Sequence, residues 1–268
     1  MSQAEIGVIG GSGFYHLLDE EATERMHVST PYGDPSDVLT VGAVAGRTVA
    51  FVPRHGAGHT LPPHRINYRA NLWALESLGV RRVVAPCASG SLRAELAPGD
   101  VVVCDQFIDA TRGRRDDTFF DGPAVAHLSA PRPYCAELRA AAAAAAREAG
   151  LTAHDGGTVV VVEGPRFSTV AESHRYRQMG GDLLNMTQYP EVVLARELGL
   201  CYTALALVTD YDTGLDESGL AAVTQEDVLR VFAAKVSLLR EAVLRLVAAL
   251  PDHRVCDCAA GRPEPINH

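Results

Sequence analysis

The chain has 268 residues, of which 47% are hydrophobic and 21% are charged, an ordinary composition for a globular protein. Its net charge of −9 argues against nucleic-acid binding through a basic surface. No apolar stretch is long enough to span a membrane and none resembles a signal peptide, so we expect a cytoplasmic protein without a membrane partner.

Short apolar runs alternate with helical patterns in the N-terminal half of the chain. We expect a helix over 64–78, ending at Gly79, and strands over 6–9, 38–44, 47–52, 80–85 and 101–107. The segment 109–133 is polar, rich in Arg, Asp and Pro, and shows no periodicity. A connection of this length indicates a lid or a subunit contact.

The alternation continues in the C-terminal half. We expect strands over 158–163, 182–185 and 202–208, and helices over 133–150, 169–179, 190–198 and 224–250. This order predicts a three-layer αβα fold around a central mixed sheet. We find no linker, repeat or second core, so a single domain over 1–250 is expected, followed by a loose polar tail over 251–268.

Asp210 and Asp212 directly follow the apolar run 202–208. Carboxylates at i and i+2 of an extended segment point to one face, and their repulsion raises the pKa of one above the usual value of about 3.9. A protonated carboxyl donates a hydrogen bond and its ionised neighbour accepts one, which suits a nitrogen heterocycle with an acceptor beside an amino group. A turn or helix start capped by Asp is the alternative.

Two further strand ends carry groups that suit an anion. Glycines and Ser12 in 10–13 bring backbone and hydroxyl donors close to a ligand, but the motif is neither a dinucleotide fingerprint nor a P-loop. Arg54 offers bidentate recognition of phosphate, and His55 adds a donor. Together they predict one pocket for a free phosphate ion. A tight turn and an ordinary charged surface loop are the alternatives.

Later strand ends add groups that suit a nucleoside. Phe167 follows the strand 158–163 and could stack on a heterocycle, although an isolated Phe is more often a core residue. Thr187 follows the strand 182–185 and could bind an anion, while Met186 could cover the apolar face of a sugar.

Four of the six cysteines, at 87, 104, 135 and 201, lie in apolar contexts and are expected to be buried thiols of a reducing compartment. Cys256 and Cys258 could be a redox pair, half a metal site or part of an inert tail. No second close pair of ligands accompanies them along the sequence, although His253 is near, and no metal is expected.

Nine motifs together resemble the purine nucleoside phosphorylase superfamily of trimeric enzymes, most closely its 5'-methylthioadenosine phosphorylase members. The motifs follow the family's order over nearly the whole chain: 7–13, 54–56, 67–73, 90–93, 98–100, 163–168, 185–187, 190–195 and 209–212. The resemblance implies a nucleoside-phosphorylase-like fold and a cytoplasmic homotrimer. It also implies phosphorolysis of 5'-methylthioadenosine to adenine and 5-methylthioribose 1-phosphate, in methionine and purine salvage. Inorganic phosphate would be a co-substrate, with no cofactor.

The same resemblance implies residue roles. Phosphate would be held by Ser12, Arg54, His55, Cys87, Ala88 and Thr187. The nucleoside would be bound by Phe167, Ser168 and Met186, by Gln225 near the 5' substituent, and by His127 reaching from a neighbouring subunit. Asp210 and Asp212 would be the catalytic pair on the adenine edge, with protonated Asp210 serving N7 and ionised Asp212 accepting from the 6-amino group.

The chain departs from the family pattern at two positions. Cys87 stands where related enzymes commonly have Thr, and Gln225 stands where methylthio-selective members have a small apolar residue, although a shift of two residues would place Val223 there. A purine nucleoside phosphorylase acting on adenosine, other 5'-deoxyadenosines, inosine or methylthioinosine is therefore the alternative, as is a non-catalytic binding module. Ionised Asp210 would repel O6 of a 6-oxopurine, which argues against the inosine substrates.

Overall fold

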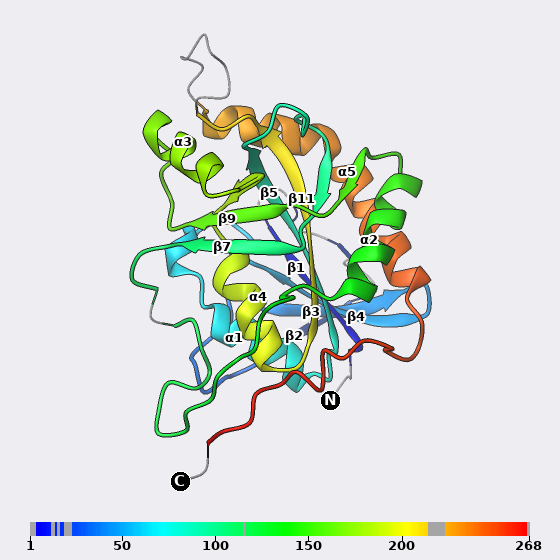
Figure 1. Ribbon diagram of the computed structural model, residues 1–268. Helices are drawn as coiled ribbons and strands as arrows, with labels where there is room; N and C mark the ends of the chain where they lie inside the picture. The colour runs from blue at the N-terminus through cyan, green and yellow to red at the C-terminus, as the bar shows by residue number, and fades with distance from the viewer. Residues whose placement is uncertain are drawn as a thin grey trace.

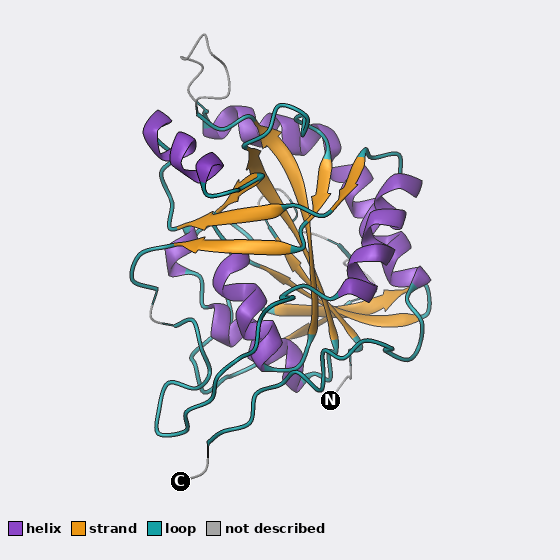
Figure 2. Cartoon of the chain, in the orientation of Figure 1, coloured by secondary structure: helices purple, strands orange, loops and turns teal. Residues whose placement is uncertain are grey.

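A computed structural model describes residues 4–11, 14, 17–18, 23–114, 116–213 and 223–266. Within these ranges eleven strands form one mixed sheet, and helices cover both of its faces (Figures 1 and 2). The expected three-layer α/β fold is confirmed. The strands are β1 (Ile6–Gly10), β2 (Glu24–Met26), β3 (Leu39–Val44), β4 (Arg47–Pro53), β5 (Arg82–Ser91), β6 (Val101–Val103), β7 (Gln106–Ala110), β8 (Ala153–Asp155), β9 (Thr158–Val162), β10 (Leu183–Asn185) and β11 (Cys201–Asp210).

The centre of the sheet is parallel. Strand β1 pairs in parallel with β4 and β5, and β11 runs parallel to β5 along its whole length. Strand β10 joins the other side of β5 in the antiparallel direction and continues into β9 and β7. The carboxyl ends of β1, β4, β5 and β11 therefore meet at one edge, where ligands of open parallel sheets usually bind.

The helices are α1 (Tyr68–Ser77), α2 (Ala136–Glu148), α3 (Val170–Gln178), α4 (Gln188–Glu197) and α5 (Gln225–Ala249), with a short 3₁₀ turn η2 (Pro63–Arg65) before α1. Helices α2 and α5 pack together on one face of the sheet, and α1 and α4 cover the other (Figure 1). The alanine run of α2 buries four small side chains, Ala142, Ala143, Ala145 and Ala146, so this helix lies close to both α5 and the sheet.

Helices α1, α3 and α5 start at side chains that satisfy their first backbone donors. Thr169 and Glu172 form a reciprocal capping box at α3. Thr224 accepts a hydrogen bond from the Asp227 N–H at 3.1 Å and so begins α5. This start brings the first turn of α5 to the carboxyl edge of the sheet, where Gln225 and Leu229 line a cavity.

The expected single strand over 101–107 is wrong, because two strands, β6 and β7, occupy this region. Asp105 lies between them, where its carboxylate accepts the Gly157 N–H at 2.9 Å. Strand β6 pairs with β11 and β8, whereas β7 pairs with β9, so the chain changes partners at this break. Strands β2 and β8 were not expected, since three residues are too few to show a period.

The expected loose tail is also wrong for much of the segment after α5. The N–H groups of Val255 and Cys256 both donate to Glu137 Oε2 at 3.0 Å, and Arg82 Nη2 donates to the Pro251 carbonyl at 2.8 Å. Cys258 is 2% exposed and belongs to the core beneath α2 and α5. A tail with satisfied backbone donors and a buried side chain is part of the folded body. None of the described helices has both the length and the apolarity to cross a membrane.

Candidate active site

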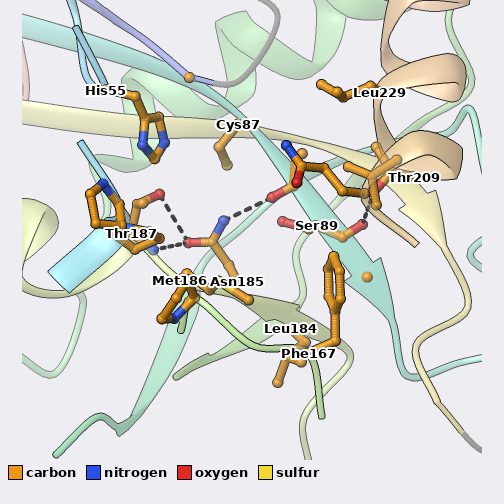
Figure 3. A pocket seen from close by; sticks show the side chains of 18 of the residues that line it. His55, Cys87, Ser89, Phe167, Leu184, Asn185, Met186, Thr187, Thr209 and Leu229 are labelled. Carbon is orange, nitrogen blue, oxygen red and sulfur yellow. Dashed lines mark hydrogen bonds between the residues drawn. The ribbon is translucent and has the colours of Figure 1, made fainter. Parts of the chain in front are cut away.

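A cavity of about 370 Å³ opens at the carboxyl edge of the sheet, between β5, β10, β11 and the start of α5 (Figure 3). This volume suits a small organic ligand. The predicted site residues that line it are Arg54, His55, Cys87, Ala88, Phe167, Met186, Thr187, Asp210, Asp212 and Gln225. Ser12 lies outside the described residues.

Arg54 follows β4 and is 1% exposed. Its Nε and Nη2 donate to the two carboxylate oxygens of Glu191 at 2.7 and 2.8 Å, while Nη1 and Nη2 also reach the carbonyls of Pro86 and Ile9. Burial lowers the pKa of Arg54, but the adjacent Glu191 carboxylate outweighs burial and raises it overall. The guanidinium is thus a fixed cation, held in place from within the protein.

Sequence reasoning missed Glu191, which lies on α4 and is 0% exposed. It also accepts the hydroxyl hydrogen of Tyr202 at 2.7 Å. A carboxylate this deeply buried needs a charged partner, and here the partner is Arg54. The one sequence signal was a Glu in the first turn of a helix, which is typical of ordinary helix starts and therefore did not single the residue out.

His55 is buried beside Arg54, and its Nδ1 lies 2.8 Å from the Leu61 carbonyl oxygen. A carbonyl only accepts, so Nδ1 carries the proton and Nε2 is left as an acceptor. Burial is the main cause that lowers the pKa of His55 to about 4, with smaller contributions from the positive charge of Arg54 and from the neighbouring His59. The two imidazoles stack with their centroids 4.3 Å apart. His55 is therefore neutral at physiological pH.

This shift makes stability depend on pH. In the unfolded chain His55 takes up a proton near pH 6.5, whereas in the folded chain it takes up the proton only near pH 4. The unfolded state binds more protons between these values, so stability falls as pH falls through this window. In phosphate-free buffer we expect His55 to account for a loss of about 3 kcal/mol in the free energy of unfolding, measured by urea titration.

The control is a comparison of two variants. His55→Gln should lose this part of the pH dependence, whereas His253→Gln, at an exposed position in the tail, should keep it. An unchanged pH profile in His55→Gln would contradict the prediction.

The side chain of Asn185 organises the middle of the cavity (Figure 3). Its Oδ1 accepts the N–H groups of Thr187 and Gln188, each at 2.7 Å, and its Nδ2 donates to the Ala88 carbonyl at 2.9 Å. One amide thus ties the end of β10 to β5. Sequence reasoning treated Asn185 only as the first residue of a motif.

Two more β5 side chains face this region. Burial raises the pKa of Cys87 to about 11, so it is a neutral thiol, and its sulfur accepts from Gln188 Nε2 at 3.6 Å. Ser89 lines the cavity, and its buried Oγ makes no well-aligned hydrogen bond among the described residues, although it is close enough to the Cys87 thiol to oppose the effect of burial on that pKa. A buried hydroxyl without a partner indicates a ligand or water position. Ser89 was missed because a Ser in an apolar strand carries no pattern of its own.

Asp210 ends β11, and the pKa values of both Asp210 and Asp212 are raised, primarily by burial. Asp210 accepts the Thr209 hydroxyl at 2.8 Å and the Asp212 N–H at 2.9 Å. Mutual repulsion adds to the raised pKa of Asp212. Its Oδ2 is buried and makes no well-aligned hydrogen bond among the described residues, so it can still accept one from a ligand beside the hydroxyls of Ser168 and Ser173.

The expected extended geometry of the two carboxylates is wrong. Asp212 has φ +38° and lies in a turn, and the register of β11 shifts between Val208 and Asp210. Asp210 also caps that turn by accepting the Asp212 N–H, which agrees with the alternative interpretation of a turn capped by Asp. The carboxylates converge on the cavity because the chain turns there. Gly90 is needed opposite them, since a Cβ at that position would lie 2.8 Å from Asp210 Oδ1.

Two predicted residues do not line the cavity. Ser168 is adjacent to it, and its hydroxyl and that of Ser173 lower the pKa of Asp212 against the effect of burial, although neither forms a well-aligned hydrogen bond. His127 is exposed in the long segment before α2. At the mouth of the cavity the structure places Gln225, with Val228 and Leu229, whereas Val223 is not among the lining residues.

The segment 109–133 is fastened to the site by a residue that sequence reasoning missed. Arg114 donates to the Met186 carbonyl at 2.7 Å and to the Tyr189 carbonyl, and its guanidinium lies over the ring of Tyr68 at 5.5 Å. Tyr189 in turn donates its hydroxyl hydrogen to Asp117 at 2.6 Å. These contacts fix the backbone that carries Met186 and Thr187.

Comparison with known proteins agrees with this geometry. A family model described as the phosphorylase superfamily matches residues 5–248. A purine nucleoside phosphorylase of Streptomyces coelicolor is 57% identical, over 97% of this chain and 94% of its own length. An S-methyl-5'-thioadenosine phosphorylase of Mycolicibacterium smegmatis is 51% identical, over 94% of this chain and 93% of its own.

A solved structure extends the comparison to the fold. Methylthioadenosine phosphorylase from Schistosoma mansoni in complex with adenine superposes with a TM-score of 0.85 at 39% identity, covering 92% of this chain and 91% of that one. The matches span nearly all of the sheet and helices described above. The chain therefore belongs to the phosphorylase superfamily and is an enzyme of its nucleoside phosphorylase, or pentosyltransferase, type.

Proposed function

We propose that the enzyme cleaves 5'-methylthioadenosine with inorganic phosphate, giving adenine and 5-methylthioribose 1-phosphate. The observation that carries this proposal is one cavity with a fixed cation, Arg54, and two carboxylates with raised pKa values, Asp210 and Asp212. The relatives from M. smegmatis and S. mansoni, whose names specify this substrate, support it.

At the purine end, the carboxylates match the edge of adenine. Protonated Asp210 donates to N7, and the Oδ2 of Asp212 accepts from the 6-amino group. Proton donation at N7 makes adenine a better leaving group as its bond to the sugar stretches. A raised pKa of Asp210 keeps more of this carboxyl protonated before the reaction.

At the other end, phosphate is bound by Arg54 together with the hydroxyls of Thr187 and Ser89 and the β5 backbone at Ala88. Ser12 and Cys87 lie on the segments expected to complete this site. Neutral His55 offers Nε2 as an acceptor, which suits a phosphate that still carries a proton. Fixed donors promote the reaction by positioning the phosphate and by stabilising the charge that moves in the transition state. We propose no metal or organic cofactor for this step.

The reaction joins the two ends. As the bond from C1' to N9 breaks, the ribosyl group gains oxocarbenium character, and a phosphate oxygen forms the new bond to C1' from the opposite face. Phe167 and Met186 line the cavity between the two ends and cover the base and the ribose. The electron pair of the broken bond stays on the purine, and Asp210 supplies its proton.

The test is phosphate-dependent release of free base, measured for 5'-methylthioadenosine, adenosine and their inosine equivalents. We expect adenine and 5-methylthioribose 1-phosphate from the first substrate, in equal amounts and only when phosphate is added. Release of adenine without phosphate, or cleavage confined to the inosine pair, would refute the proposal.

Adenosine is the second candidate substrate, and Gln225 is the observation that favours it. This polar side chain lines the mouth of the cavity, where the apolar Val228 and Leu229 would suit a methylthio group and Gln225 would suit a 5'-hydroxyl. The S. coelicolor relative is named a purine nucleoside phosphorylase, which fits a broader substrate range. In the same assay, a higher kcat/KM for adenosine than for 5'-methylthioadenosine would favour this candidate.

We further propose that the enzyme is a cytoplasmic homotrimer in which His127 reaches the site of a neighbouring subunit. Exposure of His127 outside its own cavity is compatible with this role. Light scattering should give a mass three times that of the chain, and a monomer in solution would exclude a shared site.

A further inference from the structure

Four cysteines that are far apart in the sequence converge at the end of the sheet opposite the cavity. Cys135 precedes the first turn of α2, Cys201 begins β11, and Cys256 and Cys258 lie in the segment after α5. Their four sulfur atoms all lie within 4.8 Å of one another, and those of Cys201 and Cys256 are 3.3 Å apart. Sequence reasoning found no second ligand pair for the tail because the partners come from two other elements.

The burial of this cysteine cluster distinguishes it from a chance surface grouping. Cys135, Cys201 and Cys258 are each 2% exposed, and Cys256 is partly buried. All four are thiols in the structure. A tetrahedral zinc ion with Zn–S bonds of about 2.3 Å places its sulfurs about 3.8 Å apart, within the span observed here. Small side-chain adjustments would bring the four sulfurs into a regular tetrahedron.

We propose that Cys135, Cys201, Cys256 and Cys258 bind one zinc ion in a structural site. Four thiolates leave no open coordination position, so this site has no role in the reaction. Cys201 and Asp210 stand at opposite ends of β11, which separates the zinc from the cavity by about 30 Å at the usual rise per residue. The zinc joins the tail to the start of α2 and to the first residue of the central strand β11.

Charge balance at the cluster is favourable. Four thiols and one Zn²⁺ give a tetrathiolate with a net charge of −2 and release four protons to solvent. Arg254 Nη1 lies 3.9 Å from Cys201 Sγ. The positive charge of Arg196 favours the thiolate form of Cys258. The Nε of this buried arginine has no hydrogen-bond partner among the described residues. Cys135 adds the electropositive N-terminus of α2.

The backbone around the cluster is already held in a binding arrangement. Glu137 Oε2 accepts the N–H groups of Val255 and Cys256, and Arg254 Nη1 donates to the Gly199 carbonyl at 3.1 Å. These contacts lie outside the sulfur atoms and orient the residues that carry them, as outer-shell partners of metal ligands do. The tail is thus preorganised for an ion that needs all three segments in place.

The test measures metal content of the full-length protein, purified under reducing conditions from medium containing zinc. We expect one zinc per chain by plasma mass spectrometry. Of the six thiols of the chain, we expect the four of the cluster to react with a thiol reagent only after denaturation or chelation. Replacement by Co²⁺ should give the strong visible absorption of a tetrahedral cobalt thiolate. Cys256→Ser and Cys258→Ser should lower the zinc content to a small fraction and lower Tm by several degrees.

Cys104→Ala is the matched control, because Cys104 is equally buried but lies outside the cluster, with Gln188 as its partner. This variant should keep one zinc per chain. A zinc-free protein with four reactive thiols under the same conditions, or a mass lowered by the hydrogens that two disulfides lose, would overturn the proposal. Loss of zinc from Cys104→Ala as well as from the tail variants would also overturn it, since the metal would then not depend on this cluster.

Discussion

Asp210→Asn is expected to lower kcat for 5'-methylthioadenosine by about two to four orders of magnitude. An amide can donate a hydrogen bond to N7 but cannot transfer a proton to the leaving purine. The amide also no longer repels O6 of a 6-oxopurine, so kcat of the variant for methylthioinosine should fall much less than kcat for 5'-methylthioadenosine. Steady-state kinetics with both nucleosides at saturating phosphate measure the effect.

The control for this variant is Asp252→Asn, which removes a carboxylate whose side chain is 90% exposed and which pairs with Arg47. Its kcat should match that of the unmodified enzyme. Full activity of Asp210→Asn on the adenine nucleoside would exclude Asp210 as the acid. An equal loss on both nucleosides would show that the residue shapes the cavity without reading the base.

Glu191→Gln is expected to lower the free energy of unfolding by about 3–5 kcal/mol, since it leaves the charge of Arg54 buried without a counter-charge. The NH₂ group of the new Gln is a donor that faces the N–H donors of Arg54. The Tyr202 hydroxyl then donates to a neutral amide oxygen in place of a carboxylate. We also expect KM for phosphate to rise, because Arg54 loses the contact that orients it. Urea denaturation and phosphate titration of initial rates measure the two effects.

The chain contains a matched pair that isolates burial as the cause. Arg166 and Glu172 form the same bidentate contact, with two distances of 2.7 Å, but the Arg166 side chain is 62% exposed. Glu172→Gln should therefore cost far less stability and leave KM for phosphate unchanged. Comparable losses of stability in the two variants would mean that burial does not determine how much the Arg54–Glu191 pair contributes to the free energy of unfolding.

Much of the fold follows from local patterns in the sequence. Apolar runs predicted β1, β4, β9 and β11 to within a few residues. Each of these strands is buried on both faces, so its apolar residues follow one another without interruption. The break between β6 and β7 could not be predicted, since it depends on the pairing of Asp105 with Gly157, a contact across about fifty residues. Strand β5 exceeds its apolar run because β11 and β10 pair with its polar end.

The site residues likewise divide into those that a local sequence pattern predicts and those that depend on contacts between distant parts of the chain. Arg54, Asp210 and Thr187 could be proposed from the sequence because each is a charged or hydroxyl residue at the end of a buried strand or within two residues of it. Glu191 and Arg114 could not, because each acts through a partner that only the folded chain brings near. The mutual repulsion of Asp210 and Asp212 was anticipated, but burial proved to be the larger cause of their raised pKa values.

The hydrogen bonds of Asn185 have a consequence for phosphate binding. Anion sites at helix starts usually use free backbone N–H groups and the dipole of the helix. Here the N–H groups of Thr187 and Gln188, where α4 begins, are already taken by Asn185. In the proposed phosphate site, the donors left at this point are Arg54 and the Thr187 hydroxyl, which makes only a longer contact of 3.3 Å with the same Asn185 oxygen. Point mutation can alter these two side chains one at a time. Unlike a site made from backbone alone, its affinity for phosphate can change through single substitutions that leave the helix intact.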